Sequence, residues 1–395
     1  MKHFILKACI FFSLLLGGWI SSSCRGGATP SSTSGDSAPA RIDTLEIKLL
    51  FAGDIMTHGP QIESAKCEGG RVYDFSSSFD TLASRIGAAD LAIGNLETTF
   101  AGAPYSGYPT FSSPDAMGEA LKNAGFDVLT TANNHTADKG KKGIIRTLDM
   151  LDSLGIAHTG SYRDIFDRDK MTPLILEVKG VRIAILAYTY GTNGMPVPAP
   201  TWVDPIDTVM IKKDLLRADS LGADYRIVQI HWGIEYRKEP DSEQLELARK
   251  LHRYGADAII GSHPHVVQGS QWLKSDSKTS FVIYSMGNFI SNQRKPAATR
   301  GGMLLSLTLR KVGDRITTHP DYQYVFVNKR TPQGKRVYCL LPVDPFSSDT
   351  LPSLPPEEQR DYKEFAKYYQ MIPLVLIERE DNRIRNRLQV SQRAF

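Results

Sequence analysis

The chain has 395 residues, of which 41% are hydrophobic and 23% are charged, as is ordinary for a globular protein. Its formal net charge is only +4, and the basic residues are scattered, so no stripe of positive charge indicates nucleic-acid binding. The length allows one large domain or two smaller ones.

The N-terminus has the pattern of an export signal. Lys2 and Lys7 precede a short apolar run over Ala8–Ile20, and three serines then lead to Cys24. A positive end, an apolar core and small residues are typical of a secretory signal, and the run is shorter than the ~20 residues that span a membrane. The serines and the cysteine resemble a bacterial lipoprotein signal. We therefore expect residues 1–23 to be removed, and Cys24 to be lipidated and to anchor the exported protein to the membrane of the cell envelope.

Residues 24–43 are expected to form a flexible tether. From Arg25 to Arg41 the segment is rich in Gly, Ala, Thr, Pro and Ser and has no large apolar side chain. Such a segment cannot bury enough surface to offset the entropy lost on ordering. Beyond the tether lie Cys67 and Cys339. An exported protein could join them in a disulfide, but their spacing does not imply one, and two unpaired thiols fit equally well.

From Thr44 onward, apolar runs of strand length alternate with amphipathic stretches of helix length. Ser113 and Pro114 make a favourable helix start, and Gly155 makes a favourable helix end. In chain order, we predict a strand over Leu45–Ala52, a helix over Phe79–Ala88, a strand over Leu91–Gly94, a helix over Pro114–Ala124, a strand over Val128–Ala132, a helix over Lys141–Leu154, and a hairpin of Leu174–Val178 and Val181–Tyr188.

The second half continues this alternation, which is typical of an α/β domain over residues 44–344. Its last two strands have no helix between them and suggest an antiparallel pair in a mixed second sheet. Residues 345–395 form a C-terminal extension that begins rich in proline and serine. The predicted elements are helices over Pro205–Leu221, Ser242–Tyr254 and Glu357–Tyr369, and strands over Tyr225–His231, Ala258–Gly261, Phe281–Ser285 and Met303–Arg310.

Polar clusters stand at the ends of five of these apolar runs. In open α/β sheets, ligands bind where the carboxyl ends of strands meet the following loops. Asp, Asn, Glu and His delivered to one edge of a sheet are the ligand types of a metal site. The clusters are Gly53-Asp54, Asn95-Leu96-Glu97, Asn133-Asn134-His135, His231-Trp232-Gly233 and Gly261-Ser262-His263-Pro264-His265.

The carboxylate candidates are Asp54 and Glu97. Asp54 would be a hard oxygen ligand, although a single Asp after Gly more often caps a helix or a turn. Asn95 and Glu97 share one face of a strand while Leu96 points to the other. Glu97 could bridge two metals and Asn95 could supply a carbonyl oxygen; a polar pair on an edge strand is the alternative.

The histidine candidates follow later strands. Asn134 could coordinate a metal while His135 faces a leaving group, although consecutive Asn residues also form simple turns. His231 could bind metal through a neutral ring nitrogen, with Glu235 fixing its tautomer, or it could be a core histidine.

The strongest single signal is the pair His263 and His265. The two histidines are one residue apart on an extended backbone after a glycine exit, so both can face one cavity.

Six motifs together resemble the capsule-synthesis family known as CapA, or poly-γ-glutamate capsule proteins, over about residues 46 to 310. That family is similar in turn to calcineurin-like metallophosphoesterases. The resemblance implies a four-layer α/β/β/α sandwich of two mixed sheets flanked by helices, occupying residues 44–344. The motifs are Gly53-Asp54-Ile55-Met56, Gly94-Asn95-Leu96-Glu97, Ala132-Asn133-Asn134-His135, His231–Tyr236, Gly261–Gln268 and Tyr284–Phe289.

The resemblance also implies roles for individual residues. His135 would be the catalytic His, and the metal, one or two ions of Mn, Zn or Fe, would be held by Asp54, Asn95, Glu97, Asn134, His231, His263 and His265. Asn133, Glu235 and Asn288 would support these ligands. Two departures make a second metal weak, different or absent: Met56 stands where a His is usual, and Asn95 and Glu97 replace a bridging Asp.

We therefore expect a membrane-tethered protein of capsule or poly-γ-glutamate-type polymer biosynthesis. As a hydrolase it would use a metal-activated water, with His135 protonating the leaving group of an anionic polymer or phosphoester. Arg294 and Lys295 could bind such an anion, or could simply be solvated. Membrane-bound synthase subunits are possible partners, and nucleic acid is not expected. The alternative is a non-catalytic assembly or polymer-binding factor that keeps the fold; Met56 favours this alternative, and His135 favours the enzyme.

Overall fold

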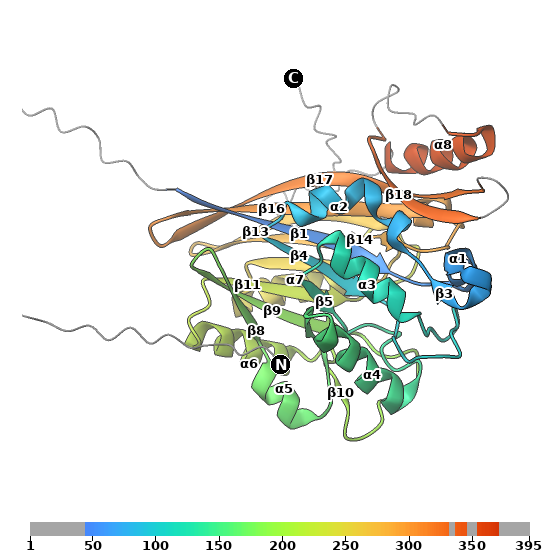
Figure 1. Ribbon diagram of the computed structural model, residues 1–395. Coiled ribbons are helices and arrows are strands. Elements are labelled where there is room, and N and C mark those ends of the chain that lie inside the picture. Colours follow the sequence, from blue (N-terminus) through green and yellow to red (C-terminus); the bar gives the residue numbers. More distant parts are fainter. Residues whose placement is uncertain (1–43, 332–335, 346–353, 371–395) are drawn as a thin grey trace, which may run out of the picture. The chain divides into compact units, whose positions relative to one another are not determined.

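The computed structural model describes residues 44–331, 336–345 and 354–370. The predicted signal, tether and lipidation site, including Cys24, lie outside these residues. Within them, two large sheets pack face to face, and helices cover the outer face of each sheet (Figure 1). The expected four-layer arrangement of two mixed sheets flanked by helices is confirmed.

The first sheet has the strand order β18-β17-β16-β1-β4-β5-β6, with β15 paired to β1. Strands β1, β4, β5 and β6 are parallel, and β16, β17 and β18 are antiparallel neighbours, so the sheet is mixed. The bounds are β1 Leu45–Ile55, β4 Leu91–Leu96, β5 Val128–Thr130, β6 Ala157–Thr159, β15 Asn288–Ile290, β16 Gly301–Val312, β17 Arg315–Arg330 and β18 Val337–Val343.

The second sheet has the order β13-β14-β12-β11-β9-β8. Its four central strands are parallel, and the two edge strands are antiparallel. The bounds are β8 Leu174–Val178, β9 Val181–Thr189, β11 Tyr225–His231, β12 Ala258–Ser262, β13 Val267–Lys274 and β14 Thr279–Met286. Two short ribbons complete the strands: β2 Lys66–Cys67 with β3 Val72–Tyr73, and β7 Ser161–Tyr162 with β10 Trp202–Val203.

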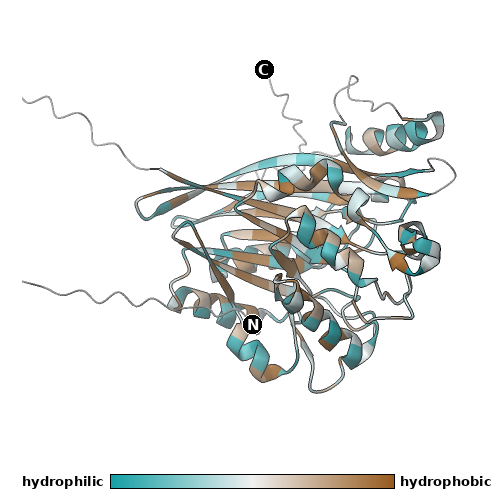
Figure 2. Cartoon of the chain, viewed as in Figure 1, coloured by the Kyte–Doolittle hydropathy of each residue, from teal (hydrophilic) through white to brown (hydrophobic). Residues whose placement is uncertain are grey.

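The strands of both large sheets are largely hydrophobic (Figure 2), and the side chains of β1 alternate between two cores. In β1, Leu49 and Phe51 face the core between the sheets, while Leu50 and Ala52 face helices α2 and α3. This period of two is the geometry of an extended backbone. Helices α6 and α7 cover the outer face of the second sheet in the same way. The helices are α1 Gly59–Ala65, α2 Asp80–Gly87, α3 Asp115–Ala124, α4 Gly140–Ser153, α5 Ile165–Met171, α6 Thr208–Ser220, α7 Ser242–Tyr254 and α8 Pro356–Gln370.

One topological prediction is wrong. The strands predicted over Phe281–Ser285 and Met303–Arg310 do not pair, because β14 belongs to the second sheet and β16 to the first. After β14 the backbone turns at Gly287, whose φ is 68°, and β15 then pairs in parallel with β1 of the other sheet. The chain therefore crosses from one sheet to the other here, next to the predicted ligand Asp54.

Some elements begin or end at residues other than those predicted, because long-range strand pairing or a helix cap sets their limits. β1 continues past Ala52 because Asp54 pairs with Asn288 of β15, beside a register shift. A side chain at Gly53 would collide with the carbonyl oxygen of Gly287, 2.0 Å from the position of its Cβ. Helix α6 begins only at Thr208 because the side chain of Asp207 accepts hydrogen bonds from two amides of its first turn.

Cys67 and Cys339 are not joined by a disulfide in the described structure; Cys339 is buried, with its Sγ 3.9 Å from Nδ2 of Asn328. No helix in the described part of the chain is long and apolar enough to span a membrane.

Candidate metal centre

The predicted ligands come together where the carboxyl ends of strands from both sheets meet. Asp54 lies near the end of β1, and Glu97 follows β4 in the first sheet. His231 ends β11, and the turn with His263 and His265 follows β12 in the second sheet. None of the five residues is more than 4% exposed. Long-range packing of two sheets thus places two carboxylates and three imidazoles in one buried space.

Two overlapping groups of these side chains have the spacing of metal ligands. One group is Glu97, His263 and His265, and the other is Asp54, Glu97 and His231; within each group the candidate ligand atoms lie within 4.8 Å of one another. Glu97 belongs to both. A carboxylate shared in this way can bridge two ions or serve one ion from either side.

Several polar atoms at the centre have no hydrogen-bond partner in the described part of the chain. They are both carboxylate oxygens of Glu97 and Nδ1 of His263, all buried. Leaving such groups unpaired costs about 1–3 kcal/mol each, and more when they are charged. A divalent cation would satisfy all three atoms, so this donor set of carboxylate and imidazole fits Mn²⁺, Zn²⁺ or Fe.

Burial also sets the protonation of these groups. It raises the pKa of Glu97 well above its usual range, helped by the negative charge of Asp54. Burial lowers the pKa of His231 well below 6.5, and lowers that of His263 to about 3, with neighbouring histidines adding to both shifts. The imidazoles of His231 and His263 are therefore neutral at physiological pH, which is the form that binds metal.

Hydrogen bonds orient two of the three histidines. Nδ1 of His265 lies 3.1 Å from both Asp54 Oδ2 and Asn288 Oδ1, which leaves Nε2 facing Glu97 at 3.9 Å. Nδ1 of His231 lies 2.9 Å from Ser262 Oγ. Asn288 therefore contacts a candidate ligand.

The two asparagines expected as ligands differ. Asn134 Oδ1 lies 2.9 Å from Nε2 of His231, so its carbonyl oxygen points into the site. Asn95 instead donates from Nδ2 to Asp54 Oδ1 at 2.9 Å, and its Oδ1 accepts from Asn133. In this arrangement Asn95 positions Asp54 through its amide nitrogen rather than offering the expected carbonyl oxygen.

His135 is fixed by one ring nitrogen. Its Nδ1 lies 2.8 Å from Oδ2 of Asp138, and its ring packs edge-on against Phe111 with centroids 4.6 Å apart. Its backbone amide donates to Oδ1 of Asn133, whose Nδ2 donates to the carbonyl of Leu96. Asn133 therefore ties this loop to the end of β4.

Some residues have contacts other than those that the sequence predicted. Glu235, expected beside His231, has Oε1 4.0 Å from Nε2 of His265 instead, and its side chain is 43% exposed. The guanidinium of Arg294 does not serve the site: it donates to Val327 O and pairs with Asp361 of α8 at 2.6 Å. Met56 is fully buried, and its carbonyl accepts from the side chain of Gln61.

Sequence reasoning missed four contributors. Ser262 orients His231, and Asp138 orients His135. Both lie inside or just after recognised motifs, and this position is the signal that could have identified them. Tyr190 places its ring over His263, with centroids 4.6 Å apart, and its hydroxyl donates to Asn193 Oδ1. Asn193 also accepts from Asn134. No local pattern singled out the Tyr190 loop, because only the fold brings it here.

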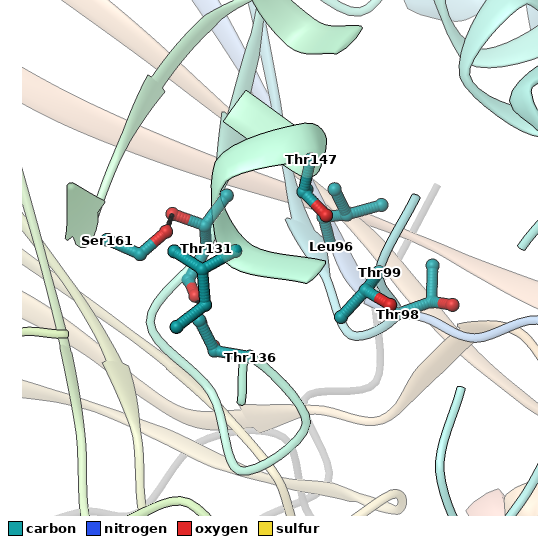
Figure 3. A pocket seen from close by; sticks show the side chains of 8 residues that line it. Leu96, Thr98, Thr99, Thr131, Thr136, Thr147 and Ser161 are labelled. Carbon is teal, nitrogen blue, oxygen red and sulfur yellow. Dashed lines mark hydrogen bonds between the residues drawn. The ribbon is translucent and has the colours of Figure 1, made fainter. Parts of the chain in front are cut away.

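A pocket behind the site is a different environment. It is lined by Leu96, Ile144, Ser161 and several threonines (Figure 3). The hydroxyl of Ser161 donates to Thr131 Oγ1 at 2.7 Å, shown dashed in the figure. Since its lining includes no carboxylate or imidazole, this pocket does not compete for a divalent metal.

The part of the chain that carries the candidate site resembles known proteins. A family model described as "Bacterial capsule synthesis protein PGA_cap" matches residues 48–293. The chain is 30% identical over 274 residues to the PGA biosynthesis protein CapA of Bacillus subtilis (strain 168), covering 67% of this chain and 68% of that protein. It is 31% identical over 212 residues to the capsule biosynthesis protein CapA of Bacillus anthracis, covering 52% of this chain and 49% of that protein. The chain thus spans about half the length of the latter relative.

Solved structures give more distant likenesses. The NAD nucleotidase of Haemophilus influenzae is 14% identical, with a TM-score of 0.47 over 85% of this chain and 64% of that chain. The calcineurin-like phosphoesterase YfkN of Bacillus subtilis is 13% identical, with a TM-score of 0.41 over 83% of this chain and all of that chain. Likenesses at this distance say nothing about activity.

Proposed function

This chain belongs to the PGA_cap family of bacterial capsule synthesis proteins, and we propose that within it the chain is a metal-dependent hydrolase of capsule or poly-γ-glutamate-type polymer biosynthesis. The observation that carries the proposal is Glu97. Among the described residues its buried carboxylate has no hydrogen-bond partner, and it belongs to both groups of candidate ligands. A structural carboxylate would be paired, whereas a ligand must keep its oxygens available.

The residues that would hold metal are Asp54, Glu97, Asn134, His231, His263 and His265. A divalent ion there would supply Lewis-acid chemistry, including activation of water near neutral pH.

The protein side chains supply the rest of the reaction. Asp138 holds the ring of His135 in one orientation, so that Nε2 can hold a proton for the leaving group. Tyr190 packs against the rings of His231 and His263, and Asn193 accepts a hydrogen bond from the candidate ligand Asn134.

The substrate we propose is an anionic polymer or a phosphoester, handled in the cell envelope by a protein tethered through lipidated Cys24. Membrane-bound synthase subunits would be its partners. The N-terminal sequence pattern and the membership of a capsule synthesis family support this setting.

A second candidate function is a non-catalytic assembly or polymer-binding factor. It is favoured by Asn95, whose amide nitrogen rather than oxygen faces Asp54, and by Met56, which removes one usual ligand. Both features reduce the donors available to a second ion, while one structural ion would remain compatible with the site.

The test replaces Glu97 with Gln in the full chain. Glu97→Gln keeps the size but removes the charge, so Mn²⁺ affinity measured by calorimetry should fall by more than the 10–100-fold typical of supporting residues. Hydrolysis of phosphomonoesters, phosphodiesters and γ-glutamyl chains with Mn²⁺ should fall with it. Glu119→Gln, an exposed change on α3, is the matched control.

Unchanged metal affinity in the Glu97 variant would overturn the metal centre. Metal binding by the wild type without turnover of any of these substrates would instead favour the assembly factor.

A further inference from the structure

The turn that carries His263 and His265 has an unfavourable backbone. His263 has φ of 97° and His265 has φ of 58°, both in the left-handed region that residues with a side chain rarely adopt. Non-glycine residues stay in this region only where the surrounding structure holds them there. The metal affinity of the proposed site therefore depends on the contacts that hold this turn in place.

One such contact comes from the last described helix, α8, the red helix in Figure 1. The amide of Val267, two residues after His265, donates to the hydroxyl of Tyr369 at 3.3 Å. That hydroxyl in turn donates to the carbonyl of Ala298 at 2.9 Å. Tyr369 is completely buried. Its single oxygen thus links the end of the histidine turn to the segment Ala297–Arg300.

A second route runs through the same segment. Nδ2 of Asn288 donates to the carbonyl of Thr299, and Oδ1 of Asn288 lies 3.1 Å from Nδ1 of His265. Arg300 holds this segment to α8 by pairing with Glu364 at 2.8 Å and donating to the carbonyl of Asp361. One route therefore leads from α8 to Val267 at the end of the turn, and the other leads from α8 to the ring of His265.

Ion pairs and aromatic packing hold α8 in place. Arg294 bridges Asp361 and the carbonyl of Val327 on β17. Phe365 and Tyr369 pack against each other and join the core between the sheets. All these anchoring residues lie beyond residue 293, where the match to the family model ends.

We propose that α8 is a clamp for the metal centre, and that Tyr369 is its positioning residue, holding the His263–His265 turn in the conformation that presents both rings. This inference rests on the proposed metal site. It adds a part of the chain outside the matched family region to the machinery that sets the affinity of that site.

The test compares two Tyr→Phe changes on the same helix in the full chain. Tyr369→Phe removes the hydroxyl that bridges Val267 and Ala298. Tyr362→Phe removes a buried hydroxyl that donates to the carbonyl of Asp344 instead. Because supporting residues typically cost 10–100-fold in metal affinity, we expect Tyr369→Phe to weaken Mn²⁺ binding by about 10-fold. Amide exchange over residues 263–267 should also accelerate, while Tyr362→Phe changes neither.

Arg300→Lys, which keeps the charge but loses the fork between Glu364 and Asp361, should shift both readouts in the same direction. This variant provides the test if Tyr369→Phe does not fold. Equal effects of the two tyrosine variants on Mn²⁺ affinity and on exchange would overturn the clamp. If the wild type binds no Mn²⁺, the proposed function fails, yet unchanged exchange over 263–267 in Tyr369→Phe would separately refute the clamp.

Discussion

At the residue scale, hydrogen bonds orient three of the histidines around the candidate site. Ser262 orients His231, Asn288 orients His265, and Asp138 orients His135. A partner on one ring nitrogen determines which nitrogen remains available. In the proposed site, these hydrogen bonds would therefore help to separate the ligand roles of His231 and His265 from the proton-donor role of His135.

The role of His135 can be tested by truncation. Since Asp138 holds His135 at Nδ1 and no candidate ligand group includes it, His135→Ala should keep metal content and fold. If the protein is the proposed hydrolase, turnover should drop by about 10²–10⁴-fold, the range for a positioned acid or base. Elemental analysis and hydrolysis rates with Mn²⁺ measure the two effects. His319→Ala, an exposed histidine on β17, is the control; full turnover in the His135 variant would remove it from the mechanism.

At the scale of elements, a buried ion cluster holds the loop that covers the site. Arg168 on α5 pairs with both Asp204, after β10, and Asp214 on α6. Asp204 also accepts from Trp202, and its backbone carbonyl accepts from the amide of Thr189, the residue before Tyr190. Burial raises the pKa of Asp204 to about 6 even with Arg168 beside it. The cluster thus joins three elements at the base of the Tyr190 loop.

Breaking this cluster should be costly. Arg168→Met would leave two carboxylates buried without their cation, and removing one partner of a buried pair typically costs about 3–5 kcal/mol. Urea unfolding of the full chain measures the loss. Lys170→Met, an exposed change on the same helix, should cost less than about 0.5 kcal/mol. A loss of similar size in both variants would mean that the cluster does not hold the loop.

At the scale of the whole molecule, buried neutral histidines make stability depend on pH. Burial lowers the pKa of His58 to about 4 and that of His263 to about 3, both below the ordinary value of 6.5. Between pH 6.5 and pH 4 the unfolded chain therefore binds more protons than the native protein. Stability contributed by these groups is complete above pH 6.5 and is lost as the pH falls towards 4.

We expect His58 alone to contribute about 2 kcal/mol to the loss between pH 7 and pH 5. His58→Gln, which stays neutral, should flatten the fall in unfolding free energy by that amount in the presence of a chelator. Urea unfolding at several pH values gives the slope. The same slope in both proteins would show that His58 takes up its proton without opposing the fold.

The proposed location of the protein at the membrane depends on one residue. Cys24→Ser should release the protein from the membrane fraction, because the acyl chain at Cys24 is the proposed anchor. Fractionation in high salt and immunoblotting measure the distribution. A variant that still sediments with membranes would contradict lipidation as the anchor.

Sequence pattern by itself determined the alternation of strands and helices and nearly all candidate ligands. Periods of two and 3.6 are local properties, and so is a glycine helix end such as Gly155, so a window of a few residues contains them. Strand-end clusters such as His263-Pro264-His265 are visible for the same reason. The parallel alternation also implied that these clusters would share an edge of a sheet.

Only the tertiary structure decided which of these residues meet. The crossing from β14 through β15 to β16, the pairing of Asn288 with His265, and the contact of Tyr369 with Val267 all join segments far apart in the chain. Glu235 lies beside His265 and not His231 for the same reason. Side-chain partners across two packed sheets depend on the crossing of strands and on packing of the shared core, and neither is contained in a local window of sequence.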